Sequence, residues 1–147
     1  MCPACFLPDL TAASREEALR AIVAAVAAHG HITDVEAAFT RLMERENIQS
    51  TAVANGIAIP HCFTDEVPDL VIAVARSRAG LEFDSFDGKP TRVVFLLMGN
   101  RREHGLHLKA LARIARLVKS TSFIESIVAS STREEMVKAF ENEEAKI

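Results

Sequence analysis

Two nearly continuous apolar runs constrain the fold of this chain more than any other feature. They are LVIAVA at residues 70–75 and TRVVFLLM at residues 91–98, and Gly99-Asn100 ends the second run. A strand with one face in water alternates apolar and polar residues, whereas an unbroken apolar run is typical of a strand covered on both faces. The sequence therefore predicts a buried sheet with helices packed on each side.

Helical segments lie before and after these strands. In a capping box, S/T-x-x-E, the first side chain satisfies a free N–H group of a new helix. We predict that four such boxes open helices: Ser14–Glu17, Thr33–Glu36, Ser122–Glu125 and Thr132–Glu135. A further helix is predicted from about His104 to Lys119, and an edge strand or irregular segment within residues 1–13. This order of elements predicts an α/β fold, a single domain over residues 1–147.

The stretch Asn55–His61, NGIAIPH, is the best candidate for a functional segment. Asn55-Gly56 is a turn signal, because Gly accepts a positive φ without a Cβ penalty. The next three residues are apolar and can enter the sheet, and Pro60 then removes a backbone donor. We therefore expect His61 where a buried strand meets a loop, a position from which scaffolds present working side chains. An ordinary histidine in a strand-end loop fits the same pattern.

Composition and charge exclude several kinds of function. The 147 residues are 49% hydrophobic and 25% charged, as in a globular protein. The net charge of −3 gives no general attraction to nucleic acid or to an anionic membrane. No apolar run approaches the ~20 residues of a membrane span, and the N-terminus lacks the pattern of a signal peptide. We expect a cytoplasmic protein without direct membrane insertion.

The sequence predicts no disulfide framework, because its number of cysteines is odd and no export signal is found. The three cysteines are Cys2, Cys5 and Cys62. Cys2 and Cys5 form a single C-x-x-C, which lacks the second pair of ligands that a zinc site needs. Cys62 follows His61 directly and is interpreted as a bystander thiol. We predict neither a metal nor a cofactor at these residues.

The other histidines could serve a metal or a helix end. His104 and His107 lie three residues apart on a predicted helix and could hold a metal with His61, but no carboxylate is obviously placed to complete the ligand set. His29 and His31 flank a glycine at the expected end of a helix, where the partial negative charge favours an imidazolium. A capping role is preferred for that pair, and no metal site is predicted.

His107 falls in the first turn of a helix whose other stripe residues are apolar. A histidine in such a stripe is usually structural, but free N–H groups at a helix N-terminus also favour an anion such as phosphate. Arg45 lies shortly before the NGIAIPH stretch. A neutral imidazole, a second histidine and an arginine suit phosphoryl transfer to nitrogen, which needs an in-line nucleophile and positive charge around the equatorial oxygens.

Five segments of the chain, taken in order, carry a family resemblance. They are RE-x-x-x-ST from Arg45 to Thr51, NGIAIPH ending at His61, FDSFDGKP at residues 83–90, VVFLLM at residues 93–98 and HLKALARIARL from His107 to Leu117. Together they resemble the enzyme IIA domain of the bacterial phosphoenolpyruvate-dependent sugar phosphotransferase system. The likeness is to the fructose/mannitol type, which includes nitrogen-regulatory proteins, and extends from about residue 7 to residue 140.

The resemblance implies that His61 is phosphorylated by the histidine-containing phosphocarrier protein, that His107 and Arg45 support the phosphate, and that no cofactor or metal is required. In sugar-transporting members the group passes to a cysteine of a IIB domain and then to the sugar. In nitrogen-regulatory members the phosphorylation state is itself the signal, read by regulated target proteins. The family fold is an α/β sandwich with a mixed central sheet, in agreement with the pattern above.

The chain departs from the family in the loop before the apolar run. The family usually has T-G-x-G-N-G there, whereas Ala52 and Ala54 replace the first two glycines in this chain, so the loop is expected to be displaced or less mobile. Phosphoryl carriage in sugar transport and a regulatory binding module are the two leading functions. A member that no longer carries phosphate is a third. The lack of an attached IIB or membrane domain slightly favours regulation.

Overall fold

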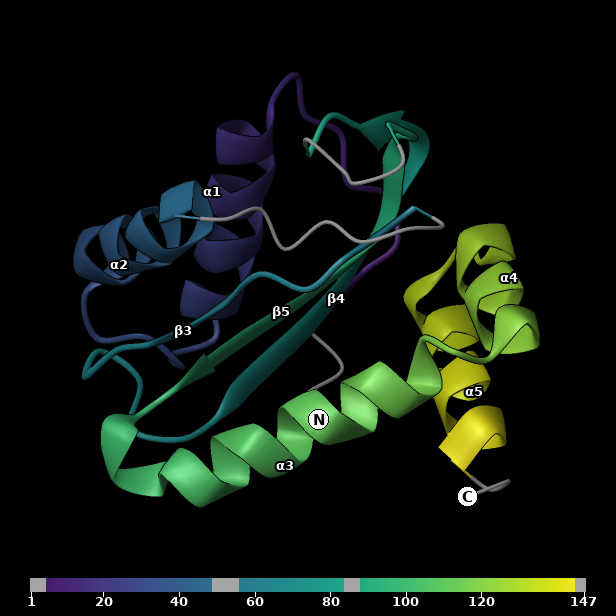
Figure 1. The fold of residues 1–147 in the computed structure, drawn as a ribbon. Coiled ribbons are helices and arrows are strands. Elements are labelled where there is room, and N and C mark those ends of the chain that lie inside the picture. The colour runs from purple at the N-terminus through teal and green to yellow at the C-terminus, as the bar shows by residue number, and fades with distance from the viewer. Residues whose placement is uncertain (1–4, 49–55, 84–87, 145–147) are drawn as a thin grey trace.

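The computed structural model describes residues 5–48, 56–83 and 88–144, with a mixed sheet at its centre (Figure 1). The strands within these residues are β1 (Phe6–Leu7), β2 (Ile57–Ala58), β3 (His61–Phe63), β4 (Val71–Leu81) and β5 (Thr91–Gly99). Their order is β1-β4-β5-β2, and β3 pairs with β5 further along than β2. β4 and β5 are antiparallel and the remaining pairs are parallel, so the predicted mixed sheet is confirmed.

The two long central strands contain the two apolar runs of the sequence. β5 matches its predicted range to within one residue, but β4 continues beyond the predicted residues 70–75 as far as Leu81. The pairing with β5 shifts register between Arg76 and Leu81, and the continuation contains exposed residues. Apolar character alone could not reveal this second half of the strand, because it is not covered on both faces.

Helices cover both faces of the sheet, as predicted (Figure 1). One layer consists of α1 (Arg15–Ala27) and α2 (Val35–Ile48); the other consists of α3 (His104–Leu117), α4 (Thr121–Ala129) and α5 (Arg133–Glu144), and a 3₁₀ turn, η2 (Arg101–Glu103), precedes α3. Along β4, Ala73 and Ala75 belong to the apolar core under α1 and α2, whereas Val74 belongs to the core under α3–α5. Alternate side chains thus enter opposite cores, which accounts for the unbroken apolar run.

Two of the four predicted capping boxes are confirmed. The Ser14 hydroxyl accepts a hydrogen bond from the N–H of Glu17 at 3.1 Å, and α1 begins at the next residue. The Thr132 hydroxyl likewise accepts from the N–H of Glu135 at 3.1 Å at the start of α5. In both cases a short hydroxyl side chain satisfies an N–H group that has no partner inside the helix.

The other two predicted boxes are wrong by one or two residues. Asp34 caps α2 by accepting the N–H three residues further on at 3.1 Å, because the Thr33 hydroxyl donates instead to the Glu66 carboxylate at 2.8 Å. Ser120 caps α4 at 3.3 Å, and Ser122 lies inside that helix. Where several short polar side chains are adjacent, the S/T-x-x-E spacing cannot tell which one the tertiary structure leaves available.

Residues 57–63 form two short strands along β5 instead of one strand that stops at Pro60. β2 ends at Ala58, the Pro60 carbonyl accepts the N–H of Leu97 at 3.0 Å, and β3 resumes with His61 opposite Leu97. The expectation that His61 begins a loop is therefore wrong. Because Pro60 lies on the edge of the sheet and contributes a carbonyl instead of an N–H group, pairing can resume after it.

Some sequence predictions lie outside the described residues. They concern Cys2 of the C-x-x-C, the alanines Ala52 and Ala54, and residues 84–87 of FDSFDGKP. Gly56, the first described residue after the alanine-containing loop, has φ of +76°, as the turn prediction expects. In the described part of the chain, no helix combines the length and the apolar character needed to cross a membrane.

Candidate functional site

A hollow of about 360 Å³ lies between α2, β3 and α3 and is lined by all three of the residues that the sequence singled out, His61, His107 and Arg45. Segments far apart in the chain therefore meet at one place. The full lining, which includes several apolar side chains, is Arg41, Glu44, Arg45, Ile48, His61, Cys62, Phe63, His107, Leu108 and Leu111.

The ring of His61 is held by one of its nitrogens. Nδ1 lies 2.7 Å from the carbonyl oxygen of Ile59, two residues earlier. Because a carbonyl can only accept, this bond assigns the proton to Nδ1 and leaves the lone pair of the neutral imidazole on Nε2. The backbone of His61 is fixed as well, since β3 pairs it with Leu97. Nε2 is thus the nitrogen of this oriented ring that carries the lone pair.

His107 is buried, with 2% of its surface exposed, and neither ring nitrogen has a hydrogen-bond partner among the described residues. Its ring centroid is 6.2 Å from that of His61. Burial lowers the pKa of His107 below its ordinary value, and the neighbouring His61 and His104 lower it further. His107 is therefore a neutral imidazole at neutral pH, with one donor and one acceptor not used by the described part of the protein.

Two residues that the sequence did not indicate as functional hold His107 in place. A Cβ added to Gly99 would lie 2.5 Å from Nδ1 of His107, so the ring occupies space that only a glycine leaves open. On another side, the centroid of the Phe63 ring is 4.2 Å from the His107 centroid. In the sequence, Gly99 indicates only the end of a strand, and no local pattern predicts that a histidine ring packs against it.

The helix N-terminus does not contribute to the site as the sequence suggested. η2 precedes α3, so His107 is the fourth residue of α3. The residues of α3 that line the hollow are His107, Leu108 and Leu111, and the first three residues of the helix are not among them. The hollow therefore opens along the side of α3, and any support that α3 gives an anion comes from the His107 ring.

Two guanidinium groups border the hollow from α2. Arg45 lies in the last turn, and Arg41 lies one turn earlier. Its i, i+4 spacing from Arg45 puts both arginines on one side of the helix, but no motif in the sequence indicates Arg41 as functional. Burial raises the pKa of Cys62 to about 12, despite the opposing charges of the two arginines. Cys62 is therefore a neutral thiol, in agreement with a bystander role.

The remaining predicted candidates do not line the hollow. His29 and His31 follow α1, and His104 is exposed at the start of α3. The His104 ring stacks on Phe63 at 5.1 Å between centroids, so it touches the site only through that ring. Within residues 5–48, 56–83 and 88–144, no group of three or more His, Cys, Asp or Glu side chains is arranged to hold a metal ion.

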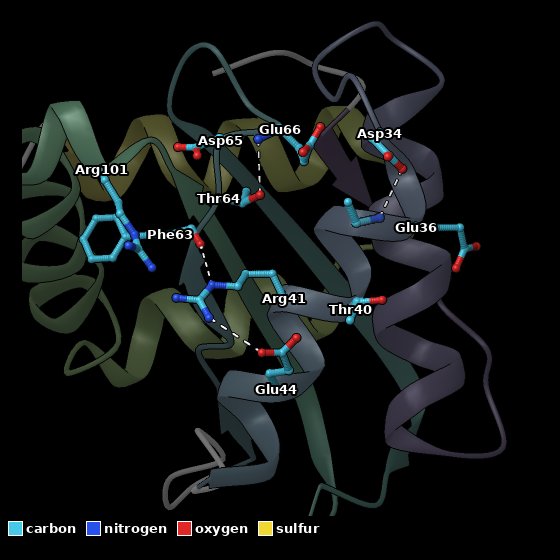
Figure 2. Close-up of a pocket in the computed structure, with 11 residues that line it drawn as sticks. Asp34, Glu36, Thr40, Arg41, Glu44, Phe63, Thr64, Asp65, Glu66 and Arg101 are labelled. Atoms are coloured by element: carbon cyan, nitrogen blue, oxygen red, sulfur yellow. Dashed lines mark hydrogen bonds and ion pairs between the residues drawn. The ribbon is translucent and has the colours of Figure 1, made fainter.

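A second, more open hollow of about 560 Å³ adjoins the first (Figure 2). The two share Arg41, Glu44 and Phe63, but the second contains neither His61 nor His107. Its lining is rich in carboxylates, namely Asp34, Glu36, Glu44, Asp65 and Glu66. The smaller hollow is the better candidate site, because it contains His61 and the His107 ring, which has no hydrogen-bond partner among the described residues.

Two histidines and an arginine thus meet in one hollow at the edge of a mixed sheet between helical layers. Residues 3–143 match the family described as phosphoenolpyruvate-dependent sugar phosphotransferase system, EIIA 2. The chain belongs to this family, whose members are phosphotransfer components of that system.

Relatives of two kinds are similar in sequence. A nitrogen regulatory protein of Bradyrhizobium diazoefficiens is 38% identical over 128 residues, which cover 87% of this chain and 83% of the relative. A fructose-specific EIIA component of the phosphotransferase system of Haloferax volcanii is 30% identical over 122 residues, which cover 83% and 79%. These relatives support a phosphoryl-carrier role or a regulatory use of the phosphoryl group.

Solved structures agree with this assignment. Nitrogen regulatory protein IIA-Ntr from Neisseria meningitidis superposes with a TM-score of 0.85 at 26% identity, and the match covers 94% of each chain. IIA mannitol from Escherichia coli superposes with a TM-score of 0.81, covering 95% of this chain and 97% of that one. At 19% identity, the second comparison shows a shared fold.

Proposed function

We propose that this protein carries a phosphoryl group on Nε2 of His61, received from a phosphohistidine of the histidine-containing phosphocarrier protein. The observation that carries the proposal is the bond from Nδ1–H of His61 to the Ile59 carbonyl, since it leaves Nε2 as the nitrogen with a lone pair. His107 and Arg45 line the same hollow. The EIIA family and both kinds of relative support phosphoryl transfer as the chemistry, and hence a transferase role.

In the proposed step, the Nε2 lone pair of His61 attacks phosphorus while the N–P bond of the donor breaks, and the donor nitrogen keeps the electron pair of that bond. The Nδ1 proton remains on His61, where the Ile59 carbonyl stabilises the positive charge that the ring gains. The donor ring correspondingly returns to a neutral imidazole. One N–P bond replaces another of similar energy, so the step requires no metal ion or cofactor.

His107 and Arg45 act on the phosphoryl oxygens in this proposal. The neutral His107 ring can donate one N–H to an oxygen, and this would give it a partner that the described residues do not supply. The Arg45 guanidinium adds positive charge in a planar fork that matches phosphate geometry. Both groups are in place before the phosphoryl group arrives, so little reorganisation is needed during transfer.

The subsequent fate of the phosphoryl group distinguishes two uses. A IIB domain is a candidate acceptor, because a neighbour with a TM-score of 0.81 and 18% identity, matched over 97% of each chain, is enzyme IIAMtl in complex with phosphorylated enzyme IIBMtl of Escherichia coli. The 38% identical nitrogen regulatory protein favours the other use, in which the phosphorylation state controls target proteins. A phosphate adds about −1.5 to −2 charges, enough to reverse a local surface charge.

Phosphorylation in vitro tests the proposal. We expect incubation with phosphoenolpyruvate, enzyme I and the phosphocarrier protein to add one acid-labile phosphate to the wild type and none to His61→Ala. His104→Ala is the matched control, because His104 is an exposed histidine near the site, and it should be labelled normally. A label that persists in His61→Ala would refute the nucleophile, and no label in the wild type would refute the carrier function.

A second measurement separates transport from regulation. The labelled protein is mixed with IIB domains of fructose and mannitol type, with and without the sugar and its membrane component. Passage of the label to IIB and then to sugar would assign the transport use. Retention of the label in the presence of active IIB domains would favour the regulatory use.

A further inference from the structure

Arg41 lines the same hollow as His61 but has no role in the proposed transfer step. Its Nε donates a hydrogen bond to the Phe63 carbonyl at 3.2 Å, and its Nη1 lies 3.7 Å from the Glu44 carboxylate. Figure 2 shows the guanidinium between these two partners, and Arg41 lines both hollows. The first contact fixes the base of the guanidinium fork against β3, beside the strand residues that follow His61.

The contact with Glu44 is the weaker of the two. The side chains of Arg41 and Glu44 are 44% and 60% exposed, and their closest atoms are too far apart for a hydrogen bond. Water screens such a pair, so it contributes little to stability. A dianionic phosphoryl group carries more charge than one carboxylate and accepts two parallel N–H bonds from a guanidinium, so it competes effectively for Arg41.

The charge of Arg41 also reaches the region around His61. Of the two arginines, Arg41 does more than Arg45 to lower the pKa of the adjacent Cys62 thiol, although burial outweighs both. The positive charge of Arg41 therefore extends to the strand residue next to His61.

We propose that Arg41 is a second guanidinium that binds the phosphoryl group on His61 and exchanges its Glu44 contact for the phosphoryl oxygens. This inference rests on the proposed function. The Phe63 carbonyl keeps the Nε atom in place while the Nη atoms change partner. Because Glu44 lines both hollows, its release on phosphorylation removes the arginine partner of one carboxylate in the carboxylate-rich second hollow. Phosphorylation of His61 thereby changes the charge pairing in the second hollow.

The test compares Arg41→Gln, Arg41→Lys and Glu44→Gln with the control Arg116→Gln, an exposed arginine outside both hollows. We expect Arg41→Gln to slow phosphorylation by the phosphocarrier protein about tenfold, Arg41→Lys to restore part of the rate, and Arg116→Gln to match the wild type. Glu44→Gln removes the competitor, so we expect it to phosphorylate at least as fast as the wild type.

If Arg41 only links α2 to β3 through its hydrogen bond to Phe63, its removal should lower stability without changing the phosphoryl group. The ³¹P resonance of the phosphohistidine is titrated in each variant, because a nearby guanidinium favours the dianion. We expect Arg41→Gln to raise the phosphoryl pKa by about 0.5 to 1, with Arg41→Lys in between. An unchanged phosphoryl pKa and transfer rate in folded Arg41→Gln would overturn the proposal, even if its melting temperature falls.

Two further observations keep the test decisive. If Arg41→Gln does not fold, the ¹⁵N resonances of the Arg41 guanidinium in the wild type are followed instead. We expect the Nη signals to shift and to exchange more slowly on phosphorylation while those of Arg116 do not, and unchanged Arg41 signals would overturn the inference. If the wild type is labelled and His61→Ala is not, the proposed carrier function stands even when the Arg41 inference is refuted. If the wild type is not labelled, both the carrier function and the Arg41 inference are refuted.

Discussion

The core under α3–α5 and the region around His107 differ in how their buried side chains are satisfied. Beneath α4 and α5, Phe95, Phe123 and Phe140 pack with ring centroids 5.0 to 6.4 Å apart, and all three are buried and apolar. Near the end of β5, Gly99 instead makes room for His107, which is equally buried but has no hydrogen-bond partner among the described residues. The aromatic cluster needs no polar partner, whereas the His107 ring needs one and has none among the described residues.

This difference separates stability from function. Aromatic rings that only pack against each other stabilise the fold and have no further chemistry to perform. A buried imidazole without a partner costs free energy, because burial removes its bonds to water and the protein returns none. Such a cost is tolerated where a ligand supplies the missing bonds, so the region around His107 should lose activity before stability when it is changed.

The largest expected effect is on stability and belongs to the aromatic region. We expect Phe95→Ala to lower the free energy of unfolding by about 3–5 kcal/mol, because it leaves a cavity between Phe123 and Phe140. Urea denaturation measures this loss. Phosphorylation per folded molecule should stay close to that of the wild type, and a collapse of activity in fully folded protein would end the proposed separation of the two regions.

A smaller effect on stability, with a large effect on transfer, is expected at Gly99. In Gly99→Ala the new Cβ conflicts with Nδ1 of His107, so the ring must move out of the hollow. We expect a loss of roughly 1–3 kcal/mol and transfer at least about tenfold slower. Gly105→Ala is the control: nothing lies within 4 Å of its added Cβ, and it should leave transfer unchanged. Wild-type transfer in Gly99→Ala would show that the position of the His107 ring does not matter.

At His107 the signs of the two effects should be opposite. We expect His107→Leu to stabilise the fold by about 1 kcal/mol, because an apolar side chain of similar size replaces an unpartnered polar one. Transfer should nevertheless slow, as it should in His107→Ala, which keeps the fold. Thermal melting and the phosphorylation rate are measured on the same samples, with His104→Leu as the exposed control. A destabilised His107→Leu variant would mean that the His107 ring has a stabilising partner after all.

The smallest expected effect is on the pH dependence of stability. The pKa of His107 is lowered in the folded protein, so below its ordinary value of 6.5 the unfolded chain binds a proton that the folded ring resists. Stability should therefore fall as the pH drops from about 6.5 towards the folded-state pKa, and His107 should have no such effect above 6.5. We expect the decline between pH 7 and pH 5 to be smaller in His107→Leu than in the wild type. Equal declines would exclude His107 as its cause.

Much of the fold could be predicted because its signals are local. The apolar runs of β4 and β5 and the helix starts at Ser14 and Thr132 follow from residue type and spacing alone. One predicted helix cap is wrong because a distant residue competes for the capping side chain. Thr33 bonds to Glu66, which lies across the fold, and Asp34 therefore caps α2. Sequence spacing contains no information about such a distant competitor.

The candidate site could be predicted only in part, for the same reason. His61, His107 and Arg45 were named from motifs, and the structure brings them into one hollow. Gly99 and Arg41 were missed because their relation to the site depends on the packing of β5 and α2 against it. The helix N-terminus was expected to face the site and does not: α3 begins at His104, as predicted, but its first three residues do not line the hollow.

The sequence by itself determined the order of helices and strands, the covered central sheet and the identity of the candidate nucleophile, since each depends on residues close together in the chain. Only the tertiary structure decided which nitrogen of His61 keeps its lone pair, that His107 is buried without a partner, and that Arg41 lies between two hollows. These properties depend on contacts within and between separate segments, and local composition and periodicity do not specify how those contacts form.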